Sequence, residues 1–347
     1  MKTHGILFFA LWSLLTACGS ETKTSEGPQF VTPPLPFSRT LTTLPLTDGP
    51  LAEHLIFARD VPGAQVDTLK SDLRIIDNWD GLMSATQQTT LEELLGDGVS
   101  TPESLSLWFK ERIRYILRAD LATYQLGLVY GKEGQVGLQE LGPGENAEEE
   151  VNTGGGNIGT AIYLTTLDEQ RVRGTLSYIV VLINDQWIPV LSPRAGLMRI
   201  GPALFDPNYQ VNHTNVRAYS NSLQRIEVLF HEARHSDGNS SGGSTGFPHV
   251  VCPSGSLVPP ELIGVPACDN TANGAYSVGA AVLDPLIDLC LRNARCSDAE
   301  LKGLEAIRLD RLSRVIRSTA TLKKLDPSPE TGFNALNISD FRAFNLR

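Results

Sequence analysis

The first half of the chain places apolar residues at helical spacing. From about Leu51 to Leu128 the pattern is mostly that of amphipathic helices, in which apolar residues recur every three or four positions. The clearest helix start is Ser100-Thr101-Pro102-Glu103, a capping residue followed by Pro near the first turn. The apolar positions after this start are Leu105, Trp108, Phe109, Ile113 and Ile116. We therefore expect an N-terminal helical layer whose charged residues form a solvated face.

Three later segments are rich in β-branched and aromatic residues: Ile158 to Leu164, Leu176 to Ile183 and Gln186 to Leu191. Asn184-Asp185 separates the last two, so this part of the chain predicts a small sheet with at least one hairpin. The preceding stretch, Gly142 to Gly156, is rich in Gly and Glu but lacks the Lys-Ser or Lys-Thr of a phosphate-binding loop. We interpret it as a linker.

Helical spacing returns in the last third of the chain. One apolar stripe consists of Leu223, Ile226, Phe230 and Ala233, which are separated by 3, 4 and 3 positions. Residues 274–291 and 297–325 predict two further helices that pack behind this one, and the second opens with the capping box Ser297-Asp298-Ala299-Glu300.

These elements predict an α+β fold, in which a small mixed sheet, a central helix and C-terminal helices lie on the N-terminal helical layer. The expected regions are a signal peptide (1–17), a Pro/Ser/Thr-rich tether (18–50), an N-terminal helical region (51–150), a region of sheet and helices (151–325) and a C-terminal tail (326–347).

Five residues inside the central helix, His231-Glu232-Ala233-Arg234-His235, form an H-E-x-x-H pattern. A chain of this length shows the pattern by chance about once in a hundred sequences. Its position adds weight, because His231 and His235 fall roughly opposite the apolar stripe, where a core histidine is not expected. Two imidazoles four residues apart on a helix stand one above the other and can bind one metal ion.

A sheet followed by a helix that carries H-E-x-x-H resembles the zincin metallopeptidases. The resemblance extends over about Gly154 to Leu325 and rests on the pentapeptide and the element order. It implies that residues 151–325 form a zincin-like catalytic domain, that His231 and His235 bind Zn²⁺, and that Glu232 is the general base that activates a zinc-bound water.

The third metal ligand is not fixed by any clan motif. Metzincins have His or Asp where this chain has Ser241, and the Glu and Asp motifs of gluzincins and aspzincins are absent. We favour His249, because it lies in the long Gly-rich segment from Gly238 to Ala272, and long loops in compact domains tend to be functional. Asp269 is the second candidate and Asp237 the third.

Three further residues have alternative interpretations. Glu227 can orient the ring of His231, although a surface position is the expected one. Tyr276 can donate to an oxyanion, but its spacing with later apolar residues favours a core position. Asp284 is interpreted as an N-cap before Pro285.

The start of the chain predicts export. An apolar run from Ile6 to Leu15 follows Lys2, and it is too short to span a bilayer. Leu15-Thr16-Ala17-Cys18 resembles the lipobox of bacterial lipoproteins, which implies acylation of Cys18. The absence of Asp directly after Cys18 is typical of lipoproteins of the outer membrane. A plain secretory signal is the alternative.

Without Cys18 the chain has an even number of cysteines, which predicts two disulfides in an oxidising compartment. Three pairings are possible, and we favour the one that closes the shortest loops, Cys252–Cys268 with Cys290–Cys296. The first of these bonds would hold the segment that contains His249 in place.

A formal net charge of -10 and the lack of any Lys/Arg run argue against a nucleic-acid partner and against electrostatic docking on anionic lipid. The expected membrane contact is the N-terminal lipid anchor. Together these features predict an envelope-bound zinc hydrolase that acts on a peptide or protein. Two alternatives remain: an amidase that cuts cell-wall peptides at the same site, and a non-catalytic lipoprotein with a relic or structural zinc site.

Overall fold

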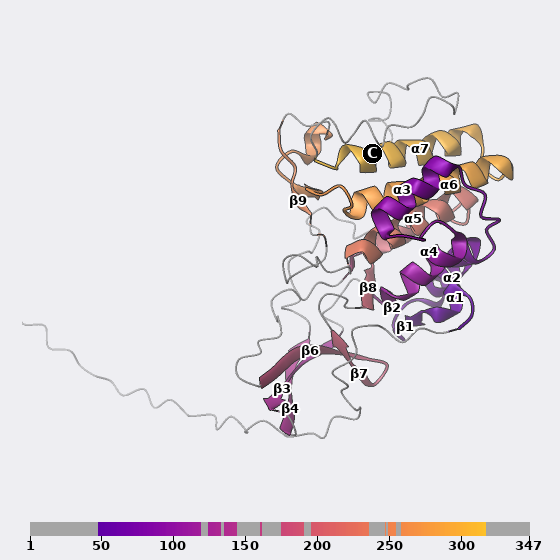
Figure 1. Cartoon of the computed structure of the whole chain (residues 1–347). Helices are drawn as coiled ribbons and strands as arrows, with labels where there is room; N and C mark the ends of the chain where they lie inside the picture. Colours follow the sequence, from indigo (N-terminus) through magenta and orange to yellow (C-terminus); the bar gives the residue numbers. More distant parts are fainter. Residues whose placement is uncertain are drawn as a thin grey trace, which may run out of the picture.

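The computed structural model describes residues 48–118, 124–132, 135–143, 160–161, 175–190, 196–235, 247, 249–254 and 258–316 (Figure 1). The expected signal peptide, Cys18, most of the tether and the C-terminal tail lie outside the described residues. In the part that is described, no helix combines the length and apolar character needed to cross a membrane.

The fold is a mixture of helices and small sheets, as the α+β prediction requires. The α-helices are α1 (Leu51–His54), α2 (Gly63–Asp77), α3 (Ala85–Leu95), α4 (Pro102–Lys110), α5 (Tyr219–His235), α6 (Ala275–Arg292) and α7 (Asp298–Ser313). Short 3-10 turns are η2 (Pro202–Phe205), η3 (Pro207–Tyr209) and η4 (Pro260–Leu262). Figure 1 shows the longer helices gathered into one body with α5 among them.

Three sheets accompany the helices. The first has the order β1-β2-β8-β5, formed by β1 (Ile56–Phe57), β2 (Ile113–Arg118), β8 (Gly196–Ile200) and β5 (Thr160–Ala161). Its first three strands are parallel, and β5 is antiparallel to β8 at the edge. The second sheet is an antiparallel meander of order β4-β3-β6-β7, formed by β4 (Gln135–Pro143), β3 (Gln125–Lys132), β6 (Thr175–Ile183) and β7 (Gln186–Val190). The third pairs β9 (Val250–Val251) with β10 (Pro266–Cys268).

The predicted hairpin between β6 and β7 is confirmed. Asn184 and Asp185 have φ values of 50° and 67°, as a two-residue turn with both residues in the left-handed region requires. The caps predicted for α4 and α7 are also present, since Thr101 and Ser297 each accept a hydrogen bond from the backbone N–H three residues later.

The helical prediction is wrong for residues 113–118 and 125–132, which are strands. Helix α4 ends at Lys110, and Ile113 and Ile116 belong to β2. Because β2 lies between two parallel neighbours, it is buried on both faces and its apolar residues do not alternate. Their spacing of three therefore imitates a helix. The predicted linker also begins later than expected, because β4 extends to Pro143.

Asp284 is not an N-cap, since α6 continues through Asp284 and Pro285 to Arg292. Its carboxylate instead accepts a hydrogen bond from Gln87 of α3 at 2.9 Å and lies 3.4 Å from the Arg308 guanidinium of α7. These contacts keep the residue in the body of the helix.

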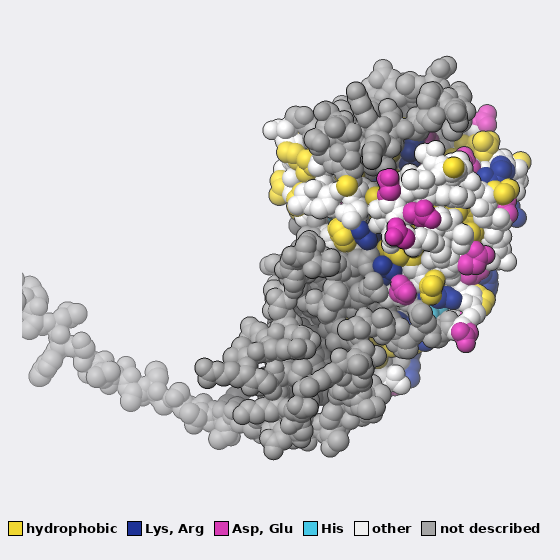
Figure 2. Space-filling view, viewed as in Figure 1, with side chains coloured by type: hydrophobic (Ala, Val, Ile, Leu, Met, Phe, Trp, Pro, Cys, Tyr) yellow, Lys and Arg dark blue, Asp and Glu magenta, His cyan; other side chains and the backbone are white. Residues whose placement is uncertain are grey.

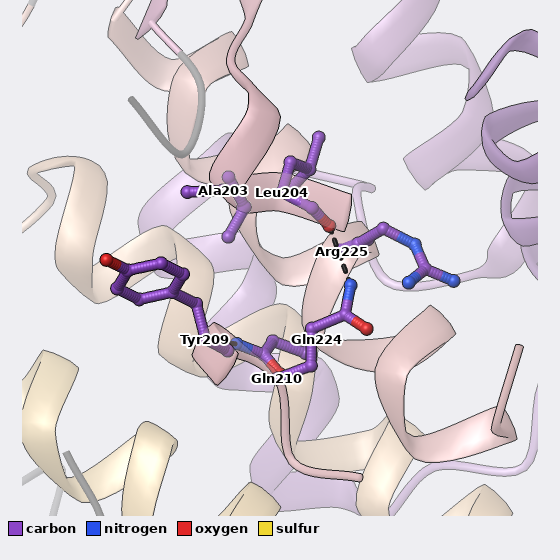
Figure 3. A pocket seen from close by; sticks show the side chains of 7 residues that line it. Ala203, Leu204, Tyr209, Gln210, Gln224 and Arg225 are labelled. Atoms are coloured by element: carbon purple, nitrogen blue, oxygen red, sulfur yellow. Dashed lines mark hydrogen bonds between the residues drawn. The ribbon is translucent and has the colours of Figure 1, made fainter. Parts of the chain in front are cut away.

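One hydrophobic core joins the N-terminal helices to α5, α6 and α7. The side chain of Phe230 stacks on Trp108 at 5.8 Å between ring centroids and tilts against Phe109 at 5.1 Å. Beside α5 a cavity of about 10 Å³, room for about one water molecule, is lined by residues that include Tyr209 and Arg225 (Figure 3). Gln210 donates to the Leu204 carbonyl at its edge.

A buried ion pair fixes α5 to α2. Arg225 donates to the two carboxylate oxygens of Asp72 at 2.6 and 3.1 Å, and both side chains are 1% exposed. Removing one partner from such a pair leaves an uncompensated buried charge, whereas replacing both with apolar residues often has little net effect.

We expect Asp72→Ala to lower the free energy of unfolding by about 3–5 kcal/mol, and the double variant Asp72→Leu/Arg225→Met to recover most of that loss. Urea unfolding followed by circular dichroism measures both values. If the single and double variants lose the same free energy of unfolding, the contact stabilises the fold through packing and not through charge pairing.

Candidate metal centre

The last two turns of α5 place His231 and His235 on the side opposite the apolar stripe. Leu223, Ile226, Phe230 and Ala233 are fully buried in the main core. The two histidines are buried as well, at 7% and 3% exposure, and their Nε2 atoms lie 3.2 Å apart. The helix is therefore covered on both sides, and its polar side faces an interior that α6 and α7 help to form.

The segment after α5 brings His249 to the same point, as the sequence predicted. Its Nε2 atom lies 3.1 Å from that of His235. Each of the three imidazoles offers one nitrogen, and these nitrogens all lie within 4.8 Å of one another. Two nitrogens that bind one zinc tetrahedrally at about 2.0–2.1 Å stand about 3.3 Å apart. The three histidines are thus placed to hold a metal ion.

Hydrogen bonds fix two of the three rings in the form that binds a metal. Nδ1 of His235 lies 2.7 Å from the carbonyl oxygen of Phe247, and Nδ1 of His249 lies 2.9 Å from Oδ1 of Asp269. Both oxygens can only accept, so each Nδ1 carries the proton and each Nε2 of the neutral ring keeps its lone pair. Two lone pairs that face each other at 3.1 Å repel unless a cation lies between them.

Burial keeps the helix histidines neutral. It lowers the pKa of His231 well below its usual value, and neighbouring His235 and His249 lower it further. Burial and His249 act in the same direction on the pKa of His235. Neutral imidazole is the protonation state that coordinates metals, so the environment selects the binding form before any ion arrives.

Asp269, the second candidate ligand, orients His249 instead. It is 1% exposed, and while Oδ1 accepts from His249, Oδ2 accepts from the backbone N–H of Tyr276 at 2.8 Å. A Cβ atom on Gly274 would overlap Oδ2 of Asp269, so the glycine provides the room for this carboxylate. A carboxylate behind a histidine ligand is a common support of metal sites.

Glu232 lies beside one of the three nitrogens. It is 5% exposed, and its Oε1 atom is 3.8 Å from Nε2 of His231. A buried carboxylate thus lies next to the three-histidine cluster.

Glu227 is not a surface residue, and it does not orient His231. Its side chain is fully buried and accepts from Nε and Nη2 of Arg311 in α7 at 2.9 and 3.3 Å. A Cβ on Gly279 of α6 would overlap the Glu227 carboxylate, so this glycine is what lets the ion pair form beneath the helix crossing. Nδ1 of His231 has no hydrogen-bond partner among the described residues.

Tyr276 packs on the metal centre. Its ring stacks on His249 with centroids 4.5 Å apart and tilts against His231 at 4.6 Å. Its hydroxyl accepts from Arg314 at 3.3 Å, and burial raises its pKa. The residue thus lies in the interior, as its spacing indicated, and restricts the rotation of two of the histidines.

No sequence pattern singled out Arg234, which occupies a variable position of the pentapeptide. Its Nε donates to the carbonyl of Asn273 at 2.8 Å, and its guanidinium lies 3.9 Å from the ring centroid of Phe247. The residue that supplies a carbonyl to His235 is therefore held by the same helix that carries His235. The only sequence signal for this supporting role is the number of charged residues on a helix that is otherwise expected to be buried.

Both predicted disulfides are confirmed, Cys252–Cys268 and Cys290–Cys296. Asp237, the third candidate ligand, lies outside the described residues. A surface hollow of about 370 Å³, lined by residues of α2 and α4, contains none of the candidate residues.

No protein-family model, curated protein or solved structure matches this chain. The function is therefore inferred from the residues of the site.

We expect the purified protein to contain about one zinc ion per chain. His235→Ala should lose this ion, because zinc sites use at least three protein ligands and the variant keeps only two histidines. Inductively coupled plasma mass spectrometry measures the content. His213→Ala is the matched control, since His213 is exposed and its Nδ1 lies 2.8 Å from the Pro207 carbonyl, away from the three-histidine cluster. Equal zinc in the wild type and His235→Ala would place the ion elsewhere.

Asp269→Asn should weaken zinc binding about 10–100-fold while the fold persists. An amide has one oxygen, so it cannot accept from both His249 and the Tyr276 backbone. A competition titration against a zinc-chelating dye gives the affinity. Asp288→Asn, which alters a carboxylate that accepts from Gln87, should leave the affinity unchanged; a similar loss in both variants would point to general destabilisation.

Proposed function

We propose that this chain is a zinc-dependent hydrolase that cleaves peptide bonds. The observation that carries the proposal is the cluster of three imidazole nitrogens with a buried carboxylate beside one of them. His231, His235 and His249 would hold the ion, which when bound lowers the pKa of water and polarises a carbonyl group.

Three protein ligands support a catalytic site over a structural one. Structural zinc sites are closed by four protein ligands, whereas catalytic sites leave the fourth position to water or substrate. The described residues place three histidines in the cluster, and Glu232 lies next to it without being one of the three.

Glu232 is the group that we assign to proton transfer. Its carboxylate accepts the proton of the attacking water and then delivers it to the amine that leaves. Its position within the interior, at 5% exposure, keeps competing bulk water from the carboxylate.

The edge strand β5 supports a peptide as the substrate. It contacts α5, and on one side it pairs with β8. The other side has no partner strand among the described residues. An extended peptide can pair with such an edge through main-chain hydrogen bonds, close to the helix that carries the metal ligands.

The place of action is a second part of the proposal. The signal-like apolar run and the lipobox-like residues around Cys18 support an exported protein that is anchored by lipid in the cell envelope. The two disulfides support an oxidising compartment.

Glu232→Gln should retain zinc but lower kcat/KM at least about 100-fold, because an amide cannot accept the proton. Wild type, Glu232→Gln and the control Glu93→Gln, an exposed residue of α3, are incubated with a tryptic peptide mixture and with cell-wall peptides, and mass spectrometry identifies new termini. Cleavage of cell-wall peptides alone would identify the amidase. A zinc-loaded wild type that cleaves neither substrate would favour a non-catalytic binding module.

A further inference from the structure

The segment that carries His249 lies outside the main core. Its own small cluster consists of Cys252, Val258 and Cys268, with partly buried neighbours around them. The backbone support is one short pair of strands, β9 and β10, and a bridge between Cys252 and Ile263. Two-stranded units of this size are marginally stable on their own.

This unit also leaves apolar side chains in solvent. Val251, Ile263 and Val265 are 58%, 43% and 40% exposed. Hydrophobic atoms are visible at the upper left of Figure 2, where Figure 1 places β9. Because so little apolar surface is buried, burial alone holds the unit weakly, and a covalent bond at its centre has a large effect.

Both halves of that bond connect directly to the metal centre. Cys252 follows His249 by three residues, and Cys268 immediately precedes Asp269, which accepts from Nδ1 of His249 at 2.9 Å. The chain from His249 to Cys252, the disulfide, the peptide bond to Asp269 and this hydrogen bond together form a closed ring. The ligand and its orienting carboxylate are therefore cross-linked to each other.

Asp269 is the end of the ring that the main body holds. Its backbone N–H donates to the carbonyl of Arg314 at 2.9 Å, and its carbonyl accepts from Ile316 at 2.7 Å. Its second carboxylate oxygen binds the start of α6. Through the disulfide, this anchorage also restrains the segment of His249.

We propose that the Cys252–Cys268 disulfide is a positioning device for the metal centre: it holds His249 within reach of His231 and His235, so that zinc affinity depends on this one bond. The proposal rests on the metal-binding part of the proposed function and is independent of catalysis. By linkage, zinc that stabilises the closed unit must also protect the same disulfide from reduction.

Paired substitutions test the first half of the proposal. Cys252→Ser/Cys268→Ser should weaken zinc binding about tenfold or more, as does loss of an outer support of a ligand. Its far-ultraviolet circular dichroism should remain that of the wild type, since the main core does not include this unit. Cys290→Ser/Cys296→Ser is the matched control, and its zinc affinity should equal that of the wild type.

Reduction of the wild-type protein tests the second half without any variant. A water-soluble phosphine breaks a disulfide by taking the oxygen of water: the phosphine becomes its oxide, and the two sulfurs take the two protons as thiols. Cys252 and Cys268 are buried, so the reagent reaches them only after local opening. Free zinc at about 100 times Kd should slow their reduction about 100-fold.

Alkylation of new thiols and mass spectrometry follow both disulfides in one sample. The proposal requires that zinc slow the reduction of Cys252–Cys268 and leave the rate for Cys290–Cys296 unchanged. The proposal is overturned if zinc protects neither disulfide or protects both equally. It is also overturned if Cys252→Ser/Cys268→Ser binds zinc as tightly as the wild type. A wild type that binds no zinc would overturn the proposed metal site as well, which separates the two failures.

Discussion

Helix α5 is buried along both of its sides although it carries charged and titratable side chains, and this constraint organises the rest of the structure. A buried charge is tolerated only with a partner, because desolvation costs more than packing returns. Three side chains of α5 meet the requirement, each with a different element. Arg225 pairs with Asp72 of α2, and Glu227 pairs with Arg311 of α7. Arg234 bonds to the Asn273 carbonyl just before α6.

These contacts also fix the direction of the helix relative to its neighbours. The apolar stripe alone would allow α5 to slide or rotate against α4, since packing between aromatic rings tolerates small shifts. Two charge pairs, one to α2 and one to α7, remove that freedom. The imidazoles of His231 and His235 at the end of α5 therefore have positions that do not depend on His249.

Much of the site was predictable, because its signals are local. The spacing of His231 and His235 is a property of one helix, and loop closure selected the cystine pairs correctly. His249 was predicted from the length of its loop and its position near Cys252. The supports were not predictable in the same way: the partners of Glu227 and Asp284, Arg311 and Arg308, lie far away in sequence. No periodicity within a segment reports such contacts.

The fold shows the same division between local and distant information. The turn at Asn184-Asp185 and the caps at Thr101 and Ser297 are set by a few adjacent residues and were identified. Strand β2 was mistaken for helix because its identity depends on the strands beside it. Its neighbour β8 lies roughly eighty residues later in the chain, a separation that amino-acid patterns do not bridge.

The three ligands are held by two different physical means. Helix hydrogen bonds and core packing fix His231 and His235, so their positions follow from the stability of the whole body. His249 lies on a segment with little core of its own, and ordering such a segment costs conformational entropy. Covalent closure reduces the conformations open to the segment, and Asp269 then selects the ring orientation. Folding of the main body therefore positions His231 and His235, whereas the Cys252–Cys268 cross-link positions His249.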